Sequence, residues 1–309
     1  MQVRIIDLDG AITRQDRLMA RLAPAVMPAR EWGPRIRLAC GFGRFRRFER
    51  ALAGWCGGGA DSGPCWTFVG SGDFHHVSLA LVRRQPRPFN LLVVDNHPDW
   101  VRAIPFLHCG TWVRHALRSP LLRHVYHVGG DVDFDNRFRR LAPWPELRSG
   151  RVRVFPAVRE YRRGQWRAVP SYPLRAAPTV PLTAGRVADL LRPFRDELAR
   201  HPLYVSLDKD VLTADDAPVN WDSGHLRLAE VRAVLTAFLG AARLGLAGLD
   251  VVGDWSPVVT RGWLPWLMDR TEHPRLSVDP ADATARNERA NLSIFEAVTG
   301  REVPSGEAA

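Results

Sequence analysis

The sequence is poor in cysteine and has no long apolar run. Its four cysteines, Cys40, Cys56, Cys65 and Cys109, show no paired Cys-x-x-Cys spacing. No uninterrupted apolar stretch approaches the roughly 18 residues needed to cross a bilayer, and the few apolar residues before Asp7 do not resemble a signal peptide. These absences argue against a membrane partner and predict a soluble, cytoplasmic protein with reduced thiols.

The chain also lacks a compact block of basic residues, although its formal net charge is +10 and its pI is about 10.5. The arginines are spread along the whole sequence, and the densest stretch is "GFGRFRRFER" (Gly41–Arg50). We interpret this stretch as a basic helix face or loop, so nucleic acid is not an expected partner. A basic surface would also suit an anionic substrate.

What the sequence does contain is a series of short, continuous apolar runs rich in Val, Leu and Ile. Such runs are typical of parallel strands covered on both faces, and helical patterns lie between them. Thr183 suits an N-cap, Pro193 is expected to kink its helix, and Gly240 is a predicted helix end. The apolar runs are 3–8, 67–70, 91–95, 125–128, 152–155, 203–207 and 246–252, and the helical patterns are 78–84, 110–119, 184–200, 226–240 and 291–298.

The alternation of strands and helices predicts an α/β fold, in which ligands bind at the carboxyl ends of the strands. We expect a single catalytic domain over residues 1–300 and a polar tail over 301–309. The irregular stretch Glu160–Gly185, rich in Pro and Arg, is interpreted as a surface excursion within that domain.

Ionisable residues gather where these apolar runs end. After the third run comes "DNHPD", and in an extended chain Asp95, His97 and Asp99 would point to one side, with Asn96 and Pro98 on the other. The sixth run ends in "SLDKDVL", which places Asp208 and Asp210 on one side and Lys209 opposite. The second run ends in "GSGDFHHVS", with His75 and His76 where a helix begins.

Together these ends supply four carboxylates and at least two imidazoles, enough for two metal ions that share carboxylates. In a partly dry cleft such a cluster would repel itself strongly without a cation. Oxygen-rich sites with a few histidines suit Mn²⁺ best, with Zn²⁺ and Fe²⁺ as alternatives. The sequence therefore predicts a metal centre.

The order of these motifs resembles the ureohydrolase family, which includes arginase and agmatinase. "DNHPD" is similar to that family's Asp-Ala-His-x-Asp, "SLDKDVL" to its Ser-x-Asp-x-Asp-Val-Leu, and "GSGDFHHVS" to its Gly-Gly-Asp-His-Ser with a two-residue expansion. "HCGTWV" (His108–Val113) and "GLDVVGDWSP" (Gly248–Pro257) also resemble family segments. The resemblance covers about Cys65 to Pro257.

The resemblance implies a three-layer α/β/α fold with a mostly parallel, roughly eight-stranded sheet and two Mn²⁺ ions per chain. A hydroxide between the ions would attack the carbon of a small guanidino, amidine or amide compound, and His108 would pass a proton to the leaving amine. The family also implies a homo-oligomer. The implied ligands are Asp95 and Asp208 bridging both ions, Asp99 with His76 (or, second in preference, His75) at one ion, and His97 with Asp210 at the other.

Two departures from the family pattern concern the substrate and the interior. The family's glutamate, which pairs with the substrate guanidinium, aligns with Gly253, so Asp254 is the candidate to replace it. Lys209 stands where the family has an apolar residue, and we expect it to form a buried ion pair. In the loop Asp215–Gly224, Asn220, Trp221 and Asp222 are candidate substrate contacts, although a solvated loop is equally compatible.

Two further acidic motifs are interpreted as structural. Asp131, Asp133 and Asp135 have period-two spacing but no histidine, which favours a solvated strand end or arginine partners. Asp7 and Asp9 resemble the strand-end pair of phosphatases, but no supporting motif follows them. We expect a strand-to-loop turn there, formed by Asp9 and the glycine after it.

Two other functions remain open. A histone-deacetylase-like amidohydrolase would use one Zn²⁺, and the histidine pair favours it, whereas Asp99 and Asp210 argue against it. A non-catalytic, basic binding protein that kept the metal centre would explain the missing glutamate and the positive charge.

Overall fold

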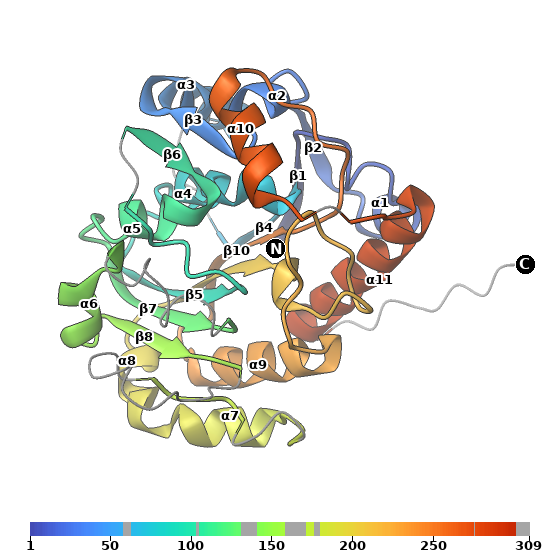
Figure 1. The fold of residues 1–309 in the computed structure, drawn as a ribbon. Helices are drawn as coiled ribbons and strands as arrows, with labels where there is room; N and C mark the ends of the chain where they lie inside the picture. The colour runs from blue at the N-terminus through green and yellow to red at the C-terminus, as the bar shows by residue number, and fades with distance from the viewer. Residues whose placement is uncertain are drawn as a thin grey trace, which may run out of the picture.

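The structure is a computed structural model that describes residues 1–57, 63–102, 105–130, 141–157, 171–175, 180–274 and 276–300. Its centre is a sheet of eight strands, all paired in parallel, in the order β2-β1-β4-β10-β9-β5-β7-β8 (Figure 1). The strands are β1 (Gln2–Asp7), β2 (Ala25–Pro28), β4 (Cys65–Gly70), β5 (Phe89–Val94), β7 (Leu122–Val128), β8 (Val152–Phe155), β9 (Leu203–Asp208) and β10 (Leu246–Val252).

Each of the seven predicted apolar runs forms a strand of this sheet, so the predicted parallel α/β architecture is confirmed. The eighth strand, β2, was not predicted. It is short, lies at the edge of the sheet and contains Pro28, which an edge strand tolerates because one of its sides has no partner. An antiparallel ribbon of β3 (Ala39–Gly41) and β6 (Phe106–His108) was also not predicted, because three-residue strands leave no readable pattern.

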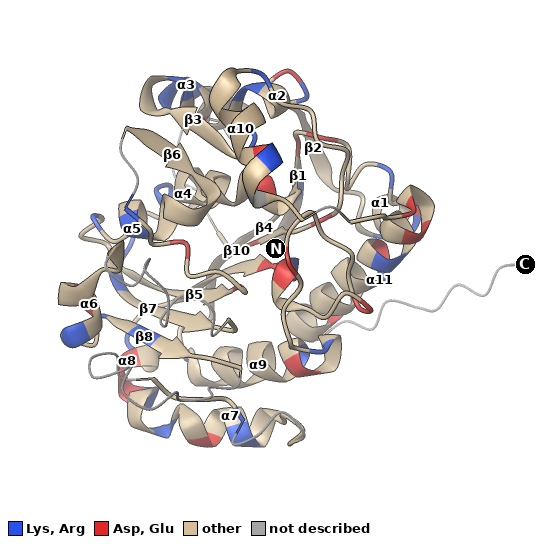
Figure 2. Cartoon of the chain, viewed as in Figure 1, with Lys and Arg blue, Asp and Glu red and all other residues tan. Residues whose placement is uncertain are grey.

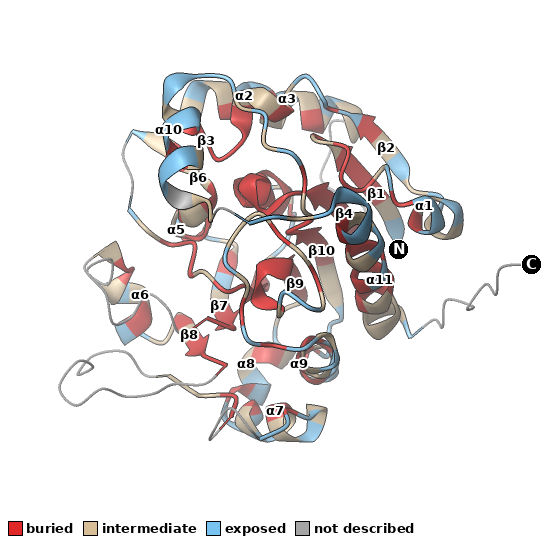
Figure 3. Cartoon of the chain, turned by 45° about the vertical axis from the view of Figure 1, so that its right-hand side comes forward, coloured by how far each residue is buried: buried red, intermediate tan, exposed pale blue. Residues whose placement is uncertain are grey.

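Two helical layers cover the sheet, as continuous apolar strands require. Alternate residues of the strands face two separate cores, one under α1, α7, α8, α9 and α11 and the other under α3, α4, α5 and α6. In Figure 3 the strands are buried and the outer helix faces are exposed. The helices are α1 (Asp16–Leu22), α2 (Gly33–Ile36), α3 (Phe42–Trp55), α4 (Ser78–Val82), α5 (Trp112–Ala116), α6 (Trp144–Arg148), α7 (Ala184–Leu190), α8 (Arg195–Ala199), α9 (Leu228–Ala241), α10 (Trp263–Glu272) and α11 (Pro280–Thr299).

Most of the predicted helix starts and breaks are confirmed. Thr183 caps α7 by accepting a hydrogen bond from the N–H of Arg186, and Pro193 lies in the 3₁₀ turn that separates α7 from α8. The prediction at Gly240 was wrong by one residue, because α9 continues through it to Ala241. The last helix, α11, is much longer than the predicted 291–298, because its polar first turns carry few apolar residues.

Some predictions fall outside the described residues. They include the tail over 301–309, the aspartates from Asp131 to Asp135, and most of Glu160–Gly185. Within the ranges that are described, no helix combines the length and apolar character needed to span a bilayer.

Candidate metal centre

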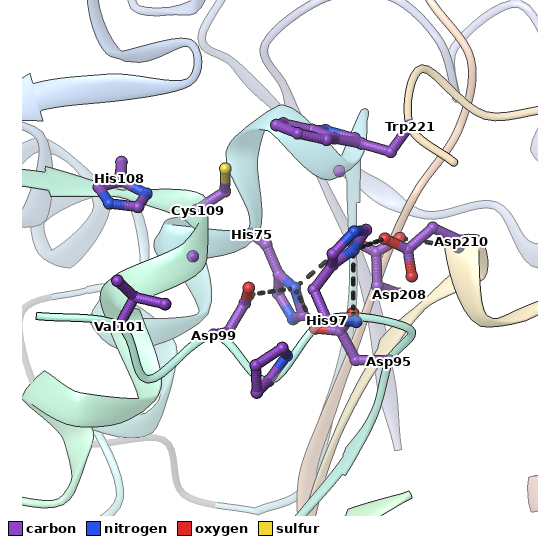
Figure 4. Close-up of a pocket in the computed structure, with 13 residues that line it drawn as sticks. His75, Asp95, His97, Asp99, Val101, His108, Cys109, Asp208, Asp210 and Trp221 are labelled. Carbon is purple, nitrogen blue, oxygen red and sulfur yellow. Dashed lines mark hydrogen bonds and ion pairs between the residues drawn. The ribbon is translucent and has the colours of Figure 1, made fainter. Parts of the chain in front are cut away.

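A pocket of about 110 Å³ lies at the carboxyl ends of the central strands. Strands β4, β10, β9 and β5 are neighbours in the sheet, so the loops that follow them meet at one edge. Figure 4 shows these loops directing their side chains into the same space. The pocket is lined by Gly72, His75, Asp95, His97, Pro98, Asp99, Val101, His108, Cys109, Gly110, Asp208, Asp210 and Trp221.

The residues after β5 converge on the pocket through a turn. Strand β5 ends at Val94, and the N–H of His97 donates to Asp95 Oδ1 at 2.7 Å. Asp99 has a φ of 49°, a left-handed conformation that aspartate tolerates better than most residues. The predicted convergence of the three ionisable residues therefore holds, but the extended chain assumed for it is wrong. Pro98, expected to face away, also lines the pocket.

The loop after β9 is tied to the loop after β5. Asp208 is the last residue of β9, and its Oδ1 accepts a hydrogen bond from the N–H of Asp210 at 3.0 Å. Asp210 Oδ1 in turn accepts from the N–H of Asn96 at 3.0 Å, and its Oδ2 lies 2.7 Å from His97 Nδ1. These backbone hydrogen bonds fix the carboxylates before any ligand binds.

Of the two adjacent histidines, the structure brings His75 to the pocket and not His76. His75 Nδ1 faces three carboxylates, at 2.9 Å from Asp99, 3.2 Å from Asp95 and 3.4 Å from Asp208. His76 is buried beside Phe45, away from the pocket. The preference for His76 is therefore corrected: the 3₁₀ turn η1 (Gly72–Val77) follows β4 directly and directs the first histidine inward.

A second row of buried groups holds His75 in place. His75 Nε2 lies 3.0 Å from Ser206 Oγ, which donates to Asp250 Oδ1 at 2.8 Å. Ser78 Oγ donates to the same oxygen at 2.6 Å. This chain favours a proton on Nε2 and leaves Nδ1 free to act as a ligand. Ser206 and Asp250 lie within the motifs "SLDKDVL" and "GLDVVGDWSP", but the sequence analysis assigned them no role.

The acidic side chains form two ligand groups that overlap. His75, Asp95 and Asp99 form one group, and Asp95, His97 and Asp210 form the other. Burial and the neighbouring carboxylates Asp99 and Asp210 raise the pKa of Asp95 well above its ordinary value. Such a cluster cannot be fully ionised without a compensating cation. The donor set of carboxylates and imidazoles thus fits divalent metal ions, with Asp95 common to both positions.

The pKa values of two more side chains of the pocket are also raised by neighbouring carboxylates. Burial and Asp210 raise the pKa of Asp208 to about 8. Burial opposes a charge on His97, but Asp210 beside it raises the pKa of His97 to about 10. His108, on β6, behaves differently, because burial and His115 lower its pKa to about 4. His108 is therefore a neutral imidazole at the pocket wall.

Lys209 forms the buried ion pair predicted for it. Its ammonium is fully buried, 2.9 Å from Asp254 Oδ1, and it donates to Asn287 Oδ1 at 2.6 Å. Gln15 and Asn291 also donate to Asp254 Oδ1. Asp254 is thereby held behind the pocket and does not line it. Its predicted role as partner of a substrate guanidinium has no geometric basis here.

Solved structures with the same architecture are known. Arginase from Bacillus subtilis aligns over 98% of this chain and 100% of its own length, with a TM-score of 0.55 and 11% sequence identity. This chain has the arginase fold. Arginase from Helicobacter pylori (TM-score 0.55, 10% identity, 96% and 99% of the two chains) and formimidoylglutamase from Bacillus subtilis (TM-score 0.54, 12% identity, 96% and 86%) are similar to it as well. The three-layer fold expected from the ureohydrolase resemblance is confirmed.

Similarity of sequence is more limited than similarity of fold for this chain. No family model matches it. An uncharacterized protein from Thermotoga maritima is 28% identical over 212 residues, which is 69% of this chain. The match spans 65% of that relative, slightly less than two thirds of its length.

Gly253 aligns with the glutamate of the ureohydrolase motif. The structure leaves no space for a side chain at this position. Its φ is +90°, and a β-carbon would lie 2.4 Å from Asp208 Oδ1 and 2.5 Å from the backbone N of Lys209. A side chain at this position would therefore collide with the candidate ligand Asp208 and with the backbone of Lys209.

We expect Gly253→Ala to destabilise the fold by about 2–4 kcal/mol, because the new methyl group meets both a strained backbone conformation and the Asp208 carboxylate. Urea unfolding measures the change. Gly240→Ala is the matched control, because nothing lies within 4 Å of its added β-carbon and alanine favours a helix by about 0.5–1 kcal/mol. Equal stabilities for the two variants would contradict this reading of Gly253.

Of the candidate substrate residues, only Trp221 reaches the pocket. Asn220 is used structurally: its Oδ1 accepts from Ser71 Oγ and from the N–H of Ser256, and its Nδ2 donates to the carbonyl of Ser256. Asp222 is exposed and does not line the pocket. The structure thus gives no support for Asn220 and Asp222 as substrate contacts.

The two N-terminal aspartates form the expected turn. Asp7 Oδ1 accepts from the N–H of Gly10, whose φ is +77°, and Asp9 Oδ1 accepts from the N–H of Ala11. Asp9 Oδ2 also accepts from Ser256 Oγ at 2.7 Å. Both carboxylates thus stabilise the expected strand-to-loop turn, and Asp9 also ties the turn to the distant Ser256.

The buried carboxylate of Asp73 connects the elements around the pocket mouth. It lies 2.6 Å from Arg37 Nε, 2.8 Å from His273 Nε2 and 2.9 Å from Trp221 Nε1. His273 Nδ1 also contacts Asp269 on α10 at 2.8 Å. Trp221 and the end of α10 are thus held by one carboxylate. The sequence analysis did not single out this role of Asp73.

The contacts of His273 with Asp73 and Asp269 are expected to make a pH-dependent contribution to the stability of the fold. Burial lowers the pKa of His273, but hydrogen bonds and charges from Asp73 and Asp269 outweigh burial and raise it. A raised pKa means that the ion pair stabilises the fold below the pKa of the unfolded chain and is lost as pH rises through the folded value. We expect the unfolding free energies of wild type and His273→Gln to differ most below the ordinary histidine pKa of about 6.5 and to converge as the pH rises through the raised pKa of His273. A difference that grows with pH would contradict the assignment.

Proposed function

We propose that this protein is a hydrolase that holds two divalent cations, Mn²⁺ being the best suited, and cleaves a C–N bond of a small molecule. The observation that carries the proposal is the pair of overlapping ligand groups that share Asp95. Asp208, 3.4 Å from His75 and hydrogen-bonded to the Asp210 backbone, stands beside both groups. Two cations bound there would lower the pKa of a water molecule and supply the nucleophile for hydrolysis.

The chain's own residues would orient the substrate and move a proton. His108 lines the wall of the pocket opposite Asp210 (Figure 4) as a neutral imidazole, able to take a proton and return it to a leaving amine. Trp221 is fixed by its hydrogen bond to Asp73 and forms a rigid apolar wall. Pro98 and Val101 extend that apolar lining. The reacting end of the substrate must be small to enter a pocket of about 110 Å³.

The missing carboxylate bears on the substrate class. Every carboxylate that lines the pocket belongs to the proposed ligand set, and Asp254 is paired with Lys209. A permanently charged guanidinium would enter without a free carboxylate to pair with it, which is unfavourable in a buried site. Within the proposed range of guanidino, amidine and amide compounds, a neutral amide fits this pocket best.

A single-zinc, deacetylase-like function receives less support. The histidine pair was its motivation, and only His75 of the pair faces the pocket. One ion would also leave the buried Asp99 and Asp210 without a reason to join the cluster. A non-catalytic binding protein would leave unexplained the neutral His108 beside the ligand groups.

The test is the metal content of protein purified with Mn²⁺, with the adjacent histidines as matched variants. We expect about two ions per chain in wild type and in His76→Ala, and about one in His75→Ala. Ammonia or urea release is then measured across guanidines, amidines and amides. One tightly held Zn²⁺ in wild type would support the deacetylase-like alternative, and no metal in any variant would overturn the proposal.

A further inference from the structure

A second pocket, separate from the metal centre, lies between α3, the β3–β6 ribbon and the start of α10. Its volume is about 420 Å³, and it shares no lining residue with the metal pocket. In Figure 1 α3, β3 and α10 lie together at one end of the molecule. The stretch Gly41–Arg50, which the metal centre does not use, forms one wall of this second pocket.

The lining of this pocket is strongly positive. Arg44 and Arg47 are three residues apart on α3 and so share a helix face, while Phe45 and Phe48 point into the core. Arg261 contributes a third guanidinium from the opposite wall. No aspartate or glutamate lines the pocket, and none pairs with these three arginines among the residues that the structure describes. Figure 2 colours the basic residues along the α3 ribbon blue.

Two other features of the lining complement these charges. Gly41, the N-cap of the 14-residue helix α3, lines the pocket without a side-chain cap, and the first turn has no acidic residue. The partial positive charge of the helix start therefore adds to that of the guanidinium groups. Trp263 lines the pocket with 71% of its surface exposed, although a tryptophan ring gains free energy from being covered.

We propose that this pocket binds a small ligand that contains both a chain of two or more phosphate groups and a planar ring, as a nucleoside diphosphate or triphosphate does. Arg44 also donates from Nη1 to the carbonyl of Arg35 at 2.9 Å, but that contact neutralises no charge. Three guanidinium groups with no carboxylate partner among the described residues require more than one negative charge for neutralisation and suit phosphate oxygens geometrically. Trp263 offers a flat surface for the ring. The volume is in the range of small-molecule sites and admits a ligand of this size.

The test is calorimetric titration of the metal-loaded protein with ATP, pyrophosphate and inorganic phosphate at about 0.15 M salt, where weak long-range attraction is screened. We expect one site per chain, with affinity falling from ATP to pyrophosphate to phosphate. The double variant Arg47→Gln/Arg261→Gln should weaken ATP binding at least about tenfold, because two charge-assisted contacts are lost. Trp263→Ala should weaken ATP and leave pyrophosphate unchanged.

The matched control is Arg46→Gln/Arg50→Gln, which removes the same charge from exposed positions of α3 outside the pocket. It should keep the affinity for ATP within about twofold. An equal loss of ATP affinity in both double variants would show that ATP binds through general charge attraction and not at this pocket. ATP affinity unchanged in Arg47→Gln/Arg261→Gln would place the phosphates on the metal ions instead. Tighter binding of a DNA duplex with the same arginine dependence would overturn the small-ligand assignment.

Discussion

Asp95→Asn is expected to leave the protein with neither metal ion and with hydrolytic activity reduced by at least about a thousandfold. Asp95 is common to both ligand groups, so one substitution removes a charged ligand from both positions. An amide oxygen is a much weaker ligand for a hard cation than a carboxylate. Metal content by elemental analysis and turnover of the best substrate are the two measurements.

The fold of this variant should survive, which separates loss of metal from loss of structure. Without metal, burial and the neighbouring carboxylates raise the pKa of Asp95, so a side chain that is always neutral suits this position. We therefore expect metal-free Asp95→Asn to unfold at the same or a higher urea concentration than metal-free wild type. Asp222→Asn, at an exposed position near the pocket, is the control and should retain both ions. A variant of Asp95 that keeps two ions would refute the shared-ligand geometry.

Lys209→Met should cost about 3–5 kcal/mol of unfolding free energy, because it leaves the buried Asp254 carboxylate without its cation. Lys209 and Asp254 are both almost inaccessible, 0% and 1% exposed, so water cannot replace the lost partner. Burial lowers the pKa of Lys209 although Asp254 opposes that shift. The pairing with Asp254 therefore keeps the Lys209 amine protonated. Methionine fills a similar volume but carries no charge.

A double-mutant cycle tests the pair itself. Asp254→Asn keeps an acceptor oxygen for Gln15 and Asn291 but removes the charge. Lys209→Met/Asp254→Asn should therefore be more stable than Lys209→Met alone, with a coupling free energy of about 1–3 kcal/mol. Additive effects would show that Lys209 acts through packing, and the ion pair would then contribute little.

The sheet could be predicted from the sequence because burial on both faces leaves a local signature. A run such as Leu91–Val94 carries its own evidence, whereas edge strand β2 and the β3–β6 ribbon depend on tertiary neighbours. The candidate ligands were found for a related reason, because parallel strands bring their carboxyl ends together. Asp95, His97 and Asp99 line one pocket as expected, although a turn, and not strand alternation, brings them together.

What could not be predicted depends on contacts between distant segments. The choice between His75 and His76 is decided by the geometry of η1 against Asp99 and Ser206. Asp254 was taken for a substrate residue because its partner, Lys209, lies 45 positions earlier in the chain, and the pairing is visible only in three dimensions. Asn220, a candidate substrate contact, likewise bonds to the distant residues Ser71 and Ser256.

Lys209 is also the one lysine among the 43 lysines and arginines of the chain. Its ammonium is fully buried and has a lowered pKa, so access and not basicity limits its reaction with an acylating reagent. Acylation of this side-chain amine therefore reports on opening of the loops behind the candidate metal centre. An increase in the mass of the peptide that contains Lys209 would record that opening, and no labelling position would have to be engineered into the chain.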